Sequence, residues 1–127
     1  MSQGLKFRTA IQASAPKPLQ IPGTINAYTA LMAERVGHHA IYLSGGGVAN
    51  ASYGLPDLGM TSLNDVLEDV RRITGATDLP LLVDIDTGWG GAFNIAKTVR
   101  DMTAAGAAAV HIDCLLYTSD AADDDHC

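Results

Sequence analysis

Short apolar runs alternate with longer amphipathic stretches along this 127-residue chain. The apolar runs lie at 19–26, 40–43, 79–86 and 107–112. Each has the length of a strand, and the nearly unbroken run LPLLV in the third is typical of strands buried on both faces in parallel sheets. The pattern therefore predicts about four parallel strands.

The stretches between these runs predict helices. The clearest covers 61–77, where Thr61 or Ser62 would cap the first turn and apolar residues recur at helical spacing. Those apolar residues are Leu63, Val66, Leu67, Val70 and Ile73. Further helices are expected at 6–14, 27–37 and 92–106, the last with Phe93, Ala96, Val99 and Met102 on one side. The small and turn-forming residues of 48–60 predict a loop.

The alternation of strands and helices indicates repeated βαβ units. Four such strands would be half of a (β/α)8 barrel, an α/β fold, and we expect residues 1–112 to form its first half. A doubly wound sheet is the alternative that the pattern leaves open. Both folds bind ligands at the carboxyl ends of their strands, which is where the polar and glycine-rich segments of this chain lie.

Two aspartates, Asp84 and Asp86, follow the third apolar run. If they belong to a strand, its period of two directs both carboxylates to the same face. Two neighbouring carboxylates are costly without a positive partner, so a divalent cation bound directly or through water would satisfy them. The alternative is that one aspartate caps the following helix and the other is solvated.

A glycine-rich segment, Ser44 to Gly47, follows the second apolar run. Glycines let backbone N–H groups approach a carboxylate or phosphate, and the serine hydroxyl adds a donor; a flexible turn is the alternative. Neither the P-loop motif nor the dinucleotide-binding motif is present. Nearby, Tyr42 could line a pocket or pack, Asp57 could support a metal site or a turn, and His111 is expected to be a hydrogen-bonded core residue.

Charge and hydropathy exclude several classes of protein. Residues 1–112 contain nine acidic and eight basic residues, with no basic cluster, which argues against nucleic acid as a partner. No apolar run approaches the roughly 18 residues of a membrane span. The amino terminus does not resemble a signal peptide, so we expect a cytoplasmic protein without membrane contact.

Four motifs are far more specific together than singly: GTINAYTALMAERVG, IYLSGGGVA, GLPDLG and LLVDIDTGWGG. With them, residues 5–112 resemble the N-terminal part of the 2-methylisocitrate lyase family, within the isocitrate lyase and phosphoenolpyruvate mutase superfamily. The resemblance implies a (β/α)8 barrel, a homotetramer and Mg²⁺. It also implies retro-aldol cleavage of a tricarboxylate, 2-methylisocitrate, to pyruvate and succinate in the methylcitrate cycle of propionate catabolism.

The resemblance also implies a role for individual residues. By this resemblance, the substrate carboxylate would be bound by Ser44, Gly45 and Gly46, and the substrate would be contacted by Tyr42. Mg²⁺ would be bound by Asp84 and Asp86, and Asp57 would support that metal site. The family's catalytic cysteine, in a KRCGH-type loop, is absent from this sequence, and neither Cys114 nor Cys127 lies in that context.

Residues 113–127 depart from the family pattern. The family continues after His111 and Ile112 with a metal-supporting glutamate, where this chain has Asp113. Translated in one reading frame, a widely used transposase sequencing adapter encodes residues 114–123. If the adapter's first base replaced the last base of a glutamate codon at position 113, that codon would encode aspartate. We therefore expect 113–127 to be a disordered, non-native tail on an incomplete and inactive half-barrel, with Asp113 in place of glutamate.

Two other interpretations stay open at this point. The parent protein could be another superfamily enzyme, such as a phosphonomutase, an oxaloacetate hydrolase or decarboxylase, or an isocitrate lyase. A chain that truly ends at residue 127 could instead be a small non-catalytic binding protein.

Overall fold

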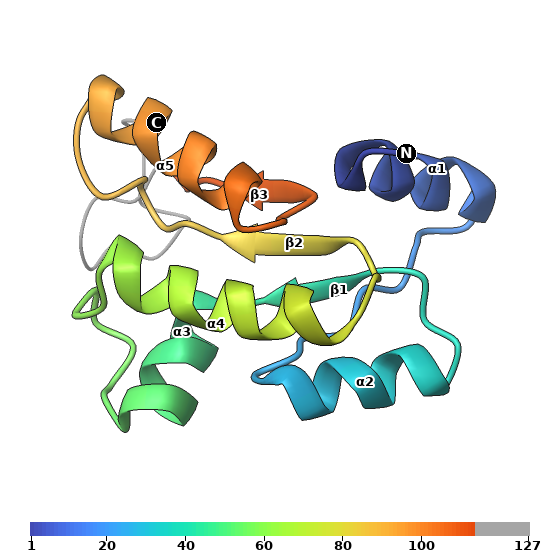
Figure 1. Cartoon of the computed structure of the whole chain (residues 1–127), viewed down its shortest axis with the longest axis horizontal. Coiled ribbons are helices and arrows are strands. Elements are labelled where there is room, and N and C mark those ends of the chain that lie inside the picture. The colour runs from blue at the N-terminus through green and yellow to red at the C-terminus, as the bar shows by residue number, and fades with distance from the viewer. Residues whose placement is uncertain (114–127) are drawn as a thin grey trace.

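The computed structural model describes residues 1–113, which form a small parallel sheet with helices packed against it (Figure 1). In chain order the elements are α1 (Gln3–Ser14), α2 (Ala27–Arg35), β1 (Ile41–Leu43), α3 (Gly45–Gly47), the π-helix η1 (Val48–Ser52), α4 (Leu63–Ala76), β2 (Leu81–Asp84), α5 (Ala92–Ala104) and β3 (Ala109–His111). The tail predicted for 113–127 lies outside the described residues except for Asp113.

The sheet has three strands in the order β1-β2-β3, and both pairs are parallel. Each crossover carries a helix, so the predicted βαβ units are confirmed. The spatial order follows the chain order with no reversal, which is the arrangement of a (β/α)8 barrel; a doubly wound sheet reverses its order at a switch point.

The strand predicted at 19–26 is reduced to a single parallel bridge between Gly23 and Tyr42. The amide of Tyr42 donates to the carbonyl of Pro22 at 2.9 Å, and the amide of Thr24 donates to the carbonyl of Tyr42 at 2.7 Å. Pro22 has no N–H to extend the ladder, which accounts for its shortness. The segment still occupies the position of a first barrel strand, beside β1.

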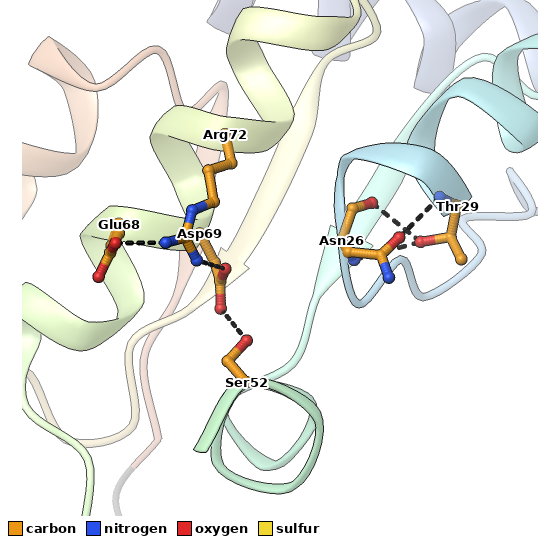
Figure 2. Close-up of polar contacts among 6 residues, drawn as sticks. All are labelled: Asn26, Thr29, Ser52, Glu68, Asp69 and Arg72. Carbon is orange, nitrogen blue, oxygen red and sulfur yellow. Dashed lines mark hydrogen bonds and ion pairs between the residues drawn. The ribbon is translucent and has the colours of Figure 1, made fainter. Parts of the chain in front are cut away.

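The core lies between the sheet and the inner face of α4. The predicted stripe of α4 is confirmed, because Val66, Leu67, Val70 and Ile73 are buried against Ile41, Leu43, Leu81 and Val83 of the strands. Ser62 is the N-cap of α4 and forms a capping box with Asp65. Asn26 and Thr29 form the equivalent capping box at the start of α2 (Figure 2).

Two details of the helix prediction were wrong. Residues 45–52, expected as a glycine-rich segment and a loop, are helical: Ser44 caps the first turn, and the π-helix η1 continues it to Ser52. In α5, Met102 is buried as predicted, but Phe93 is 93 % exposed, Val99 is also exposed, and Thr98, which was not predicted, is buried. The side of α5 that faces the sheet is therefore rotated from the predicted one.

The two ends of the strands differ. Helix α1 lies at the amino ends, and α3 lies at the carboxyl end of β1 (Figure 1). A groove of about 520 Å³ at the α1 end is lined by residues such as Lys6, Ala10, His39 and Pro80, and it contains none of the predicted site residues. Within residues 1–113 the longest helix, α4, has 14 residues, and none could cross a membrane.

Candidate functional site

The predicted site residues come together at the carboxyl ends of the three strands. The segment after β1 supplies Ser44 to Gly46, the end of β2 supplies Asp84 and Asp86, and the end of β3 leads to Asp113. Parallel strands bring these ends to one edge of the sheet, so three segments far apart in sequence share a single site.

Asp84 and Asp86 face the same glycine, but not for the reason that the strand period suggests. Strand β2 ends at Asp84, and Asp86 has a left-handed backbone with φ of 47°. A Cβ placed on Gly45 would lie 3.4 Å from Asp84 Oδ2 and 3.3 Å from Asp86 Oδ1. The turn, rather than an extended strand, therefore brings the second carboxylate beside the first.

The strained turn at Asp86 is held by neighbouring contacts. The amide of Gly88 donates to the carbonyl of Ile85 at 2.8 Å, and the buried Thr98 hydroxyl donates to the carbonyl of Gly88 at 3.1 Å. The indole N–H of Trp89 donates to the carbonyl of Thr61 at 3.1 Å. These bonds tie the turn to α5 and to the start of α4, as expected where local backbone strain persists in a folded protein.

The glycine-rich turn lies against both β2 and Asp57. The amide of Gly45 donates to Asp84 Oδ2 at 3.2 Å, and Ser44 Oγ accepts from the amide of Gly47 at 3.3 Å, leaving the hydroxyl proton of Ser44 able to donate. A Cβ on Gly46 would lie only 2.6 Å from Asp57 Oδ2. Only glycine at position 46 lets the Asp57 carboxylate approach this closely.

The end of β3 adds two groups to the same site. His111 Nε2 pairs with Asp113 Oδ1 at 2.7 Å, and the Tyr42 hydroxyl lies 3.5 Å from His111 Nδ1. The amide of Asp113 donates to the carbonyl of Asp86 at 2.7 Å. His111 is exposed rather than a core residue as predicted, since the register places it beside Asp84 at the strand end. Its place near the end of the apolar run 107–112, like that of Asp84 and Asp86 in the run before it, is the signal that could have identified it.

The electrostatics of this edge are strongly negative. Burial, followed by the charge of Asp84, raises the pKa of Asp86 above its usual range, with further contributions from Asp57 and Asp113. Burial and the charges of Asp84 and Asp113 raise the pKa of Tyr42 to about 12, so its phenol is neutral at physiological pH. Within residues 1–113, no Lys or Arg side chain forms an ion pair with Asp57, Asp84 or Asp86.

The donor set fits a hard divalent cation. Ligand atoms of Asp84, His111 and Asp113 all lie within 4.8 Å of one another, while Asp86 and Asp57 stand beside this group. Carboxylate oxygens are the preferred ligands of Mg²⁺, which usually keeps several waters. A cation here would offset both the burial of the Asp86 charge and the repulsion from Asp84, which together raise the pKa of Asp86.

The sequence of this chain is similar to a protein family and to individual enzymes of known activity. The family described as phosphoenolpyruvate phosphomutase matches residues 7–116 of the chain. A 2-methylisocitrate lyase from Vibrio cholerae serotype O1 (strain ATCC 39315 / El Tor Inaba N16961) is 69 % identical over 113 residues, which are 89 % of this chain and 36 % of the relative. The chain thus spans little more than a third of the length of the curated relatives it matches.

Solved structures resemble the fold as well. A phosphonopyruvate hydrolase in complex with oxalate and Mg²⁺ superposes with a TM-score of 0.82 at 32 % identity, covering 94 % of this chain and 41 % of that one. A 2,3-dimethylmalate lyase, a member of the phosphoenolpyruvate mutase and isocitrate lyase superfamily, gives 0.79 at 30 % identity, covering 88 % and 40 %. The described residues are therefore part of a (β/α)8 barrel.

Proposed function

Since this chain belongs to the phosphoenolpyruvate phosphomutase family, we propose that it is the N-terminal part of a Mg²⁺-dependent 2-methylisocitrate lyase. The parent enzyme would cleave 2-methylisocitrate to pyruvate and succinate in the methylcitrate cycle, as a homotetramer. The high identity to lyases of that name supports this choice over the other reactions of the superfamily.

One observation supports the metal site above all others. Four carboxylates, those of Asp57, Asp84, Asp86 and Asp113, lie at one edge of the sheet, and none of them has a Lys or Arg ion-pair partner within residues 1–113. Clustered carboxylates without a cationic side chain are destabilising unless a cation is bound. We assign Asp84, Asp86 and residue 113 to Mg²⁺, with Asp57 supporting them. Held there, Mg²⁺ would supply positive charge against the negative charge that develops as the carbon–carbon bond breaks.

The remaining residues bind and orient the substrate in this proposal. The hydroxyl of Ser44 and the amides of Gly45 and Gly46 would donate to a substrate carboxylate. The Gly45 amide, which donates to Asp84 in this structure, would exchange that acceptor for the substrate. The neutral phenol of Tyr42 faces the carboxylates and would serve as a donor to the substrate.

We further propose that residues 1–112 are a half-barrel without activity of its own. The edge strand β3 is half-buried to exposed along its length, so the sheet needs further strands beside it. The family's cysteine loop is also absent from this sequence. The 127-residue polypeptide is expected to release no pyruvate from 2-methylisocitrate.

The function is tested in a chimera that joins residues 1–112 of this chain to the C-terminal remainder of the Vibrio cholerae lyase, starting at the relative's residue that aligns with position 113. We expect pyruvate release from 2-methylisocitrate, lost in EDTA and restored by Mg²⁺. Isocitrate, oxaloacetate and phosphonopyruvate are the comparison substrates. Preference for any of these would contradict the proposal and assign the chain to another reaction of the superfamily.

Burial of the Asp86 carboxylate, followed by repulsion from Asp84, predicts that Asp86→Asn stabilises the metal-free chimera at pH 7. A raised pKa means that the folded state favours the neutral carboxyl group. Above that pKa the charged carboxylate therefore lowers the stability of the folded state. The advantage of Asp86→Asn should shrink as the pH falls from the raised pKa towards the ordinary value of aspartate. Thermal melts in EDTA measure it, with the exposed Asp78→Asn as the control; a lower Tm for Asp86→Asn would refute the expectation.

A further inference from the structure

A buried carboxylate on α4, away from the proposed metal site, contacts the segment that carries the glycine-rich turn (Figure 2). We propose that Asp69 and Ser52 are positioning residues, which fix the α3–η1 segment and thereby place Gly45, Gly46 and Asp57. This inference rests on the proposed function for its kinetic consequences, but its structural content can be tested separately.

Asp69 is unusual among the acidic residues of α4. Its side chain is 4 % exposed, although aspartate is almost never buried without a partner. The Ser52 hydroxyl donates to Asp69 Oδ2 at 2.5 Å, and Arg72 Nη1 donates to Asp69 Oδ1 at 3.1 Å. Arg72 also pairs with Glu68 on the outer face of the helix. Both oxygens of the buried carboxylate are thus satisfied, and one of them holds a residue from another element.

Ser52 is the last residue of the π-helix η1, which continues directly from α3. The segment from Gly45 to Ser52 is therefore one continuous helical piece, with the proposed anion-binding amides at its start and the Asp69 contact at its end. A π-helix is a rare, wide helical turn that is frequently found at functional sites. The hydrogen bond from Ser52 attaches the carboxyl end of this helical segment to α4.

The chain then folds back from Ser52 towards the site. The amide of Gly54 donates to the carbonyl of Asn50 at 3.1 Å, and the amide of Leu55 donates to the carbonyl of Ala49 at 2.9 Å. This return places Asp57 over Gly46, where its carboxylate would meet any added Cβ. The contact of Ser52 with Asp69 on α4 therefore positions two groups, the amides of the glycine turn and the carboxylate of Asp57.

The test compares Ser52→Ala with Thr77→Val in the chimera. Thr77 also donates its hydroxyl to a carboxylate, Glu34 Oε2, at 3.0 Å, but at the far end of α4. Ser52→Ala is expected to lower kcat/KM for 2-methylisocitrate by about tenfold to a hundredfold, as for other residues that orient a site from behind. Thr77→Val should lower the Tm without changing kcat/KM by more than about twofold. Ser52→Thr, which keeps the hydroxyl, should restore most of the activity.

Hydrogen exchange separates the two proposals. Amides of 45–52 should exchange faster in Ser52→Ala than in the parent chimera, and no faster in Thr77→Val. This result is expected even if the parent chimera has no lyase activity, which would overturn the proposed function alone. Unchanged exchange at 45–52 in Ser52→Ala, or equal losses of kcat/KM in Ser52→Ala and Thr77→Val, would overturn the positioning role.

Discussion

The substitution Asp84→Asn should reduce kcat of the chimera by about a hundredfold to a thousandfold, the scale seen when one electrostatic partner of a developing charge is removed. Asp84 is central to the site: Oδ2 accepts from the amide of Gly45 and Oδ1 accepts from the amide of Asp86. Asparagine has the same shape but a single acceptor oxygen and no charge. It therefore cannot accept from both amides in the substrate-free site, and it cannot balance the charge of a cation as a carboxylate does.

The matched control is Asp78→Asn, the same chemical change at a carboxylate that is 90 % exposed and that pairs with Lys6, at 3.9 Å, among residues 1–113. Exposed pairs of this kind contribute little to stability, so kcat should stay within about twofold of the parent. Steady-state kinetics over a range of Mg²⁺ concentrations would measure both variants. If Asp84→Asn kept the kcat and the Mg²⁺ dependence of the parent chimera, the assignment of Asp84 to the site would be wrong.

The second large effect is expected for Gly46→Ala. The added methyl group would lie 2.6 Å from Asp57 Oδ2 and 3.0 Å from its Cγ, so the carboxylate must swing away from the glycine turn. Because a short side chain can yield, the loss of stability should be modest, about 1 kcal/mol, at the low end of overpacking costs. The loss of activity should be large, roughly a hundredfold, since the amides of the glycine turn and the Asp57 carboxylate would both move.

Gly75→Ala is the control for this change. Gly75 lies in α4, and a methyl group added there would have no neighbouring atom within 4 Å. Alanine should therefore stabilise the helix by up to about 1 kcal/mol and leave kcat/KM unchanged. Urea denaturation and pyruvate release together separate the two variants. If Gly46→Ala retained parental kcat/KM, close approach of Asp57 to Gly46 would have no part in catalysis.

Much of the fold could be predicted from the sequence, because local patterns determine it. The buried run ending at Asp84 and the apolar stripe of α4 are periodic, and the N-cap Ser62 is a local signal. The grouping of Ser44 to Gly46 with Asp84 followed from one general rule, that parallel strands present their carboxyl ends at one edge. Which carboxylate meets which amide was not predictable at this level.

The features that were missed depend on contacts between distant residues. The left-handed backbone of Asp86 is supported by Thr98 and by the bond of Trp89 to Thr61, 28 residues away, and no local pattern reports these partners. The hydrogen bond of Ser52 to Asp69 likewise joins residues 17 apart in sequence, and the sequence shows Asp69 only as one charge on an amphipathic helix. The exposure of Phe93 shows that apolar spacing alone does not orient a helix on a sheet.

The most direct test of the assigned site is a crystal structure of the chimera with oxalate and Mn²⁺, whose anomalous scattering locates the metal. We expect a single strong peak among the carboxylates of Asp84, Asp86 and residue 113, with an oxalate carboxylate on the amides of Gly45 and Gly46. A peak at another place in the barrel, or oxalate bound away from the glycine turn, would contradict the assignment of these residues to metal and substrate.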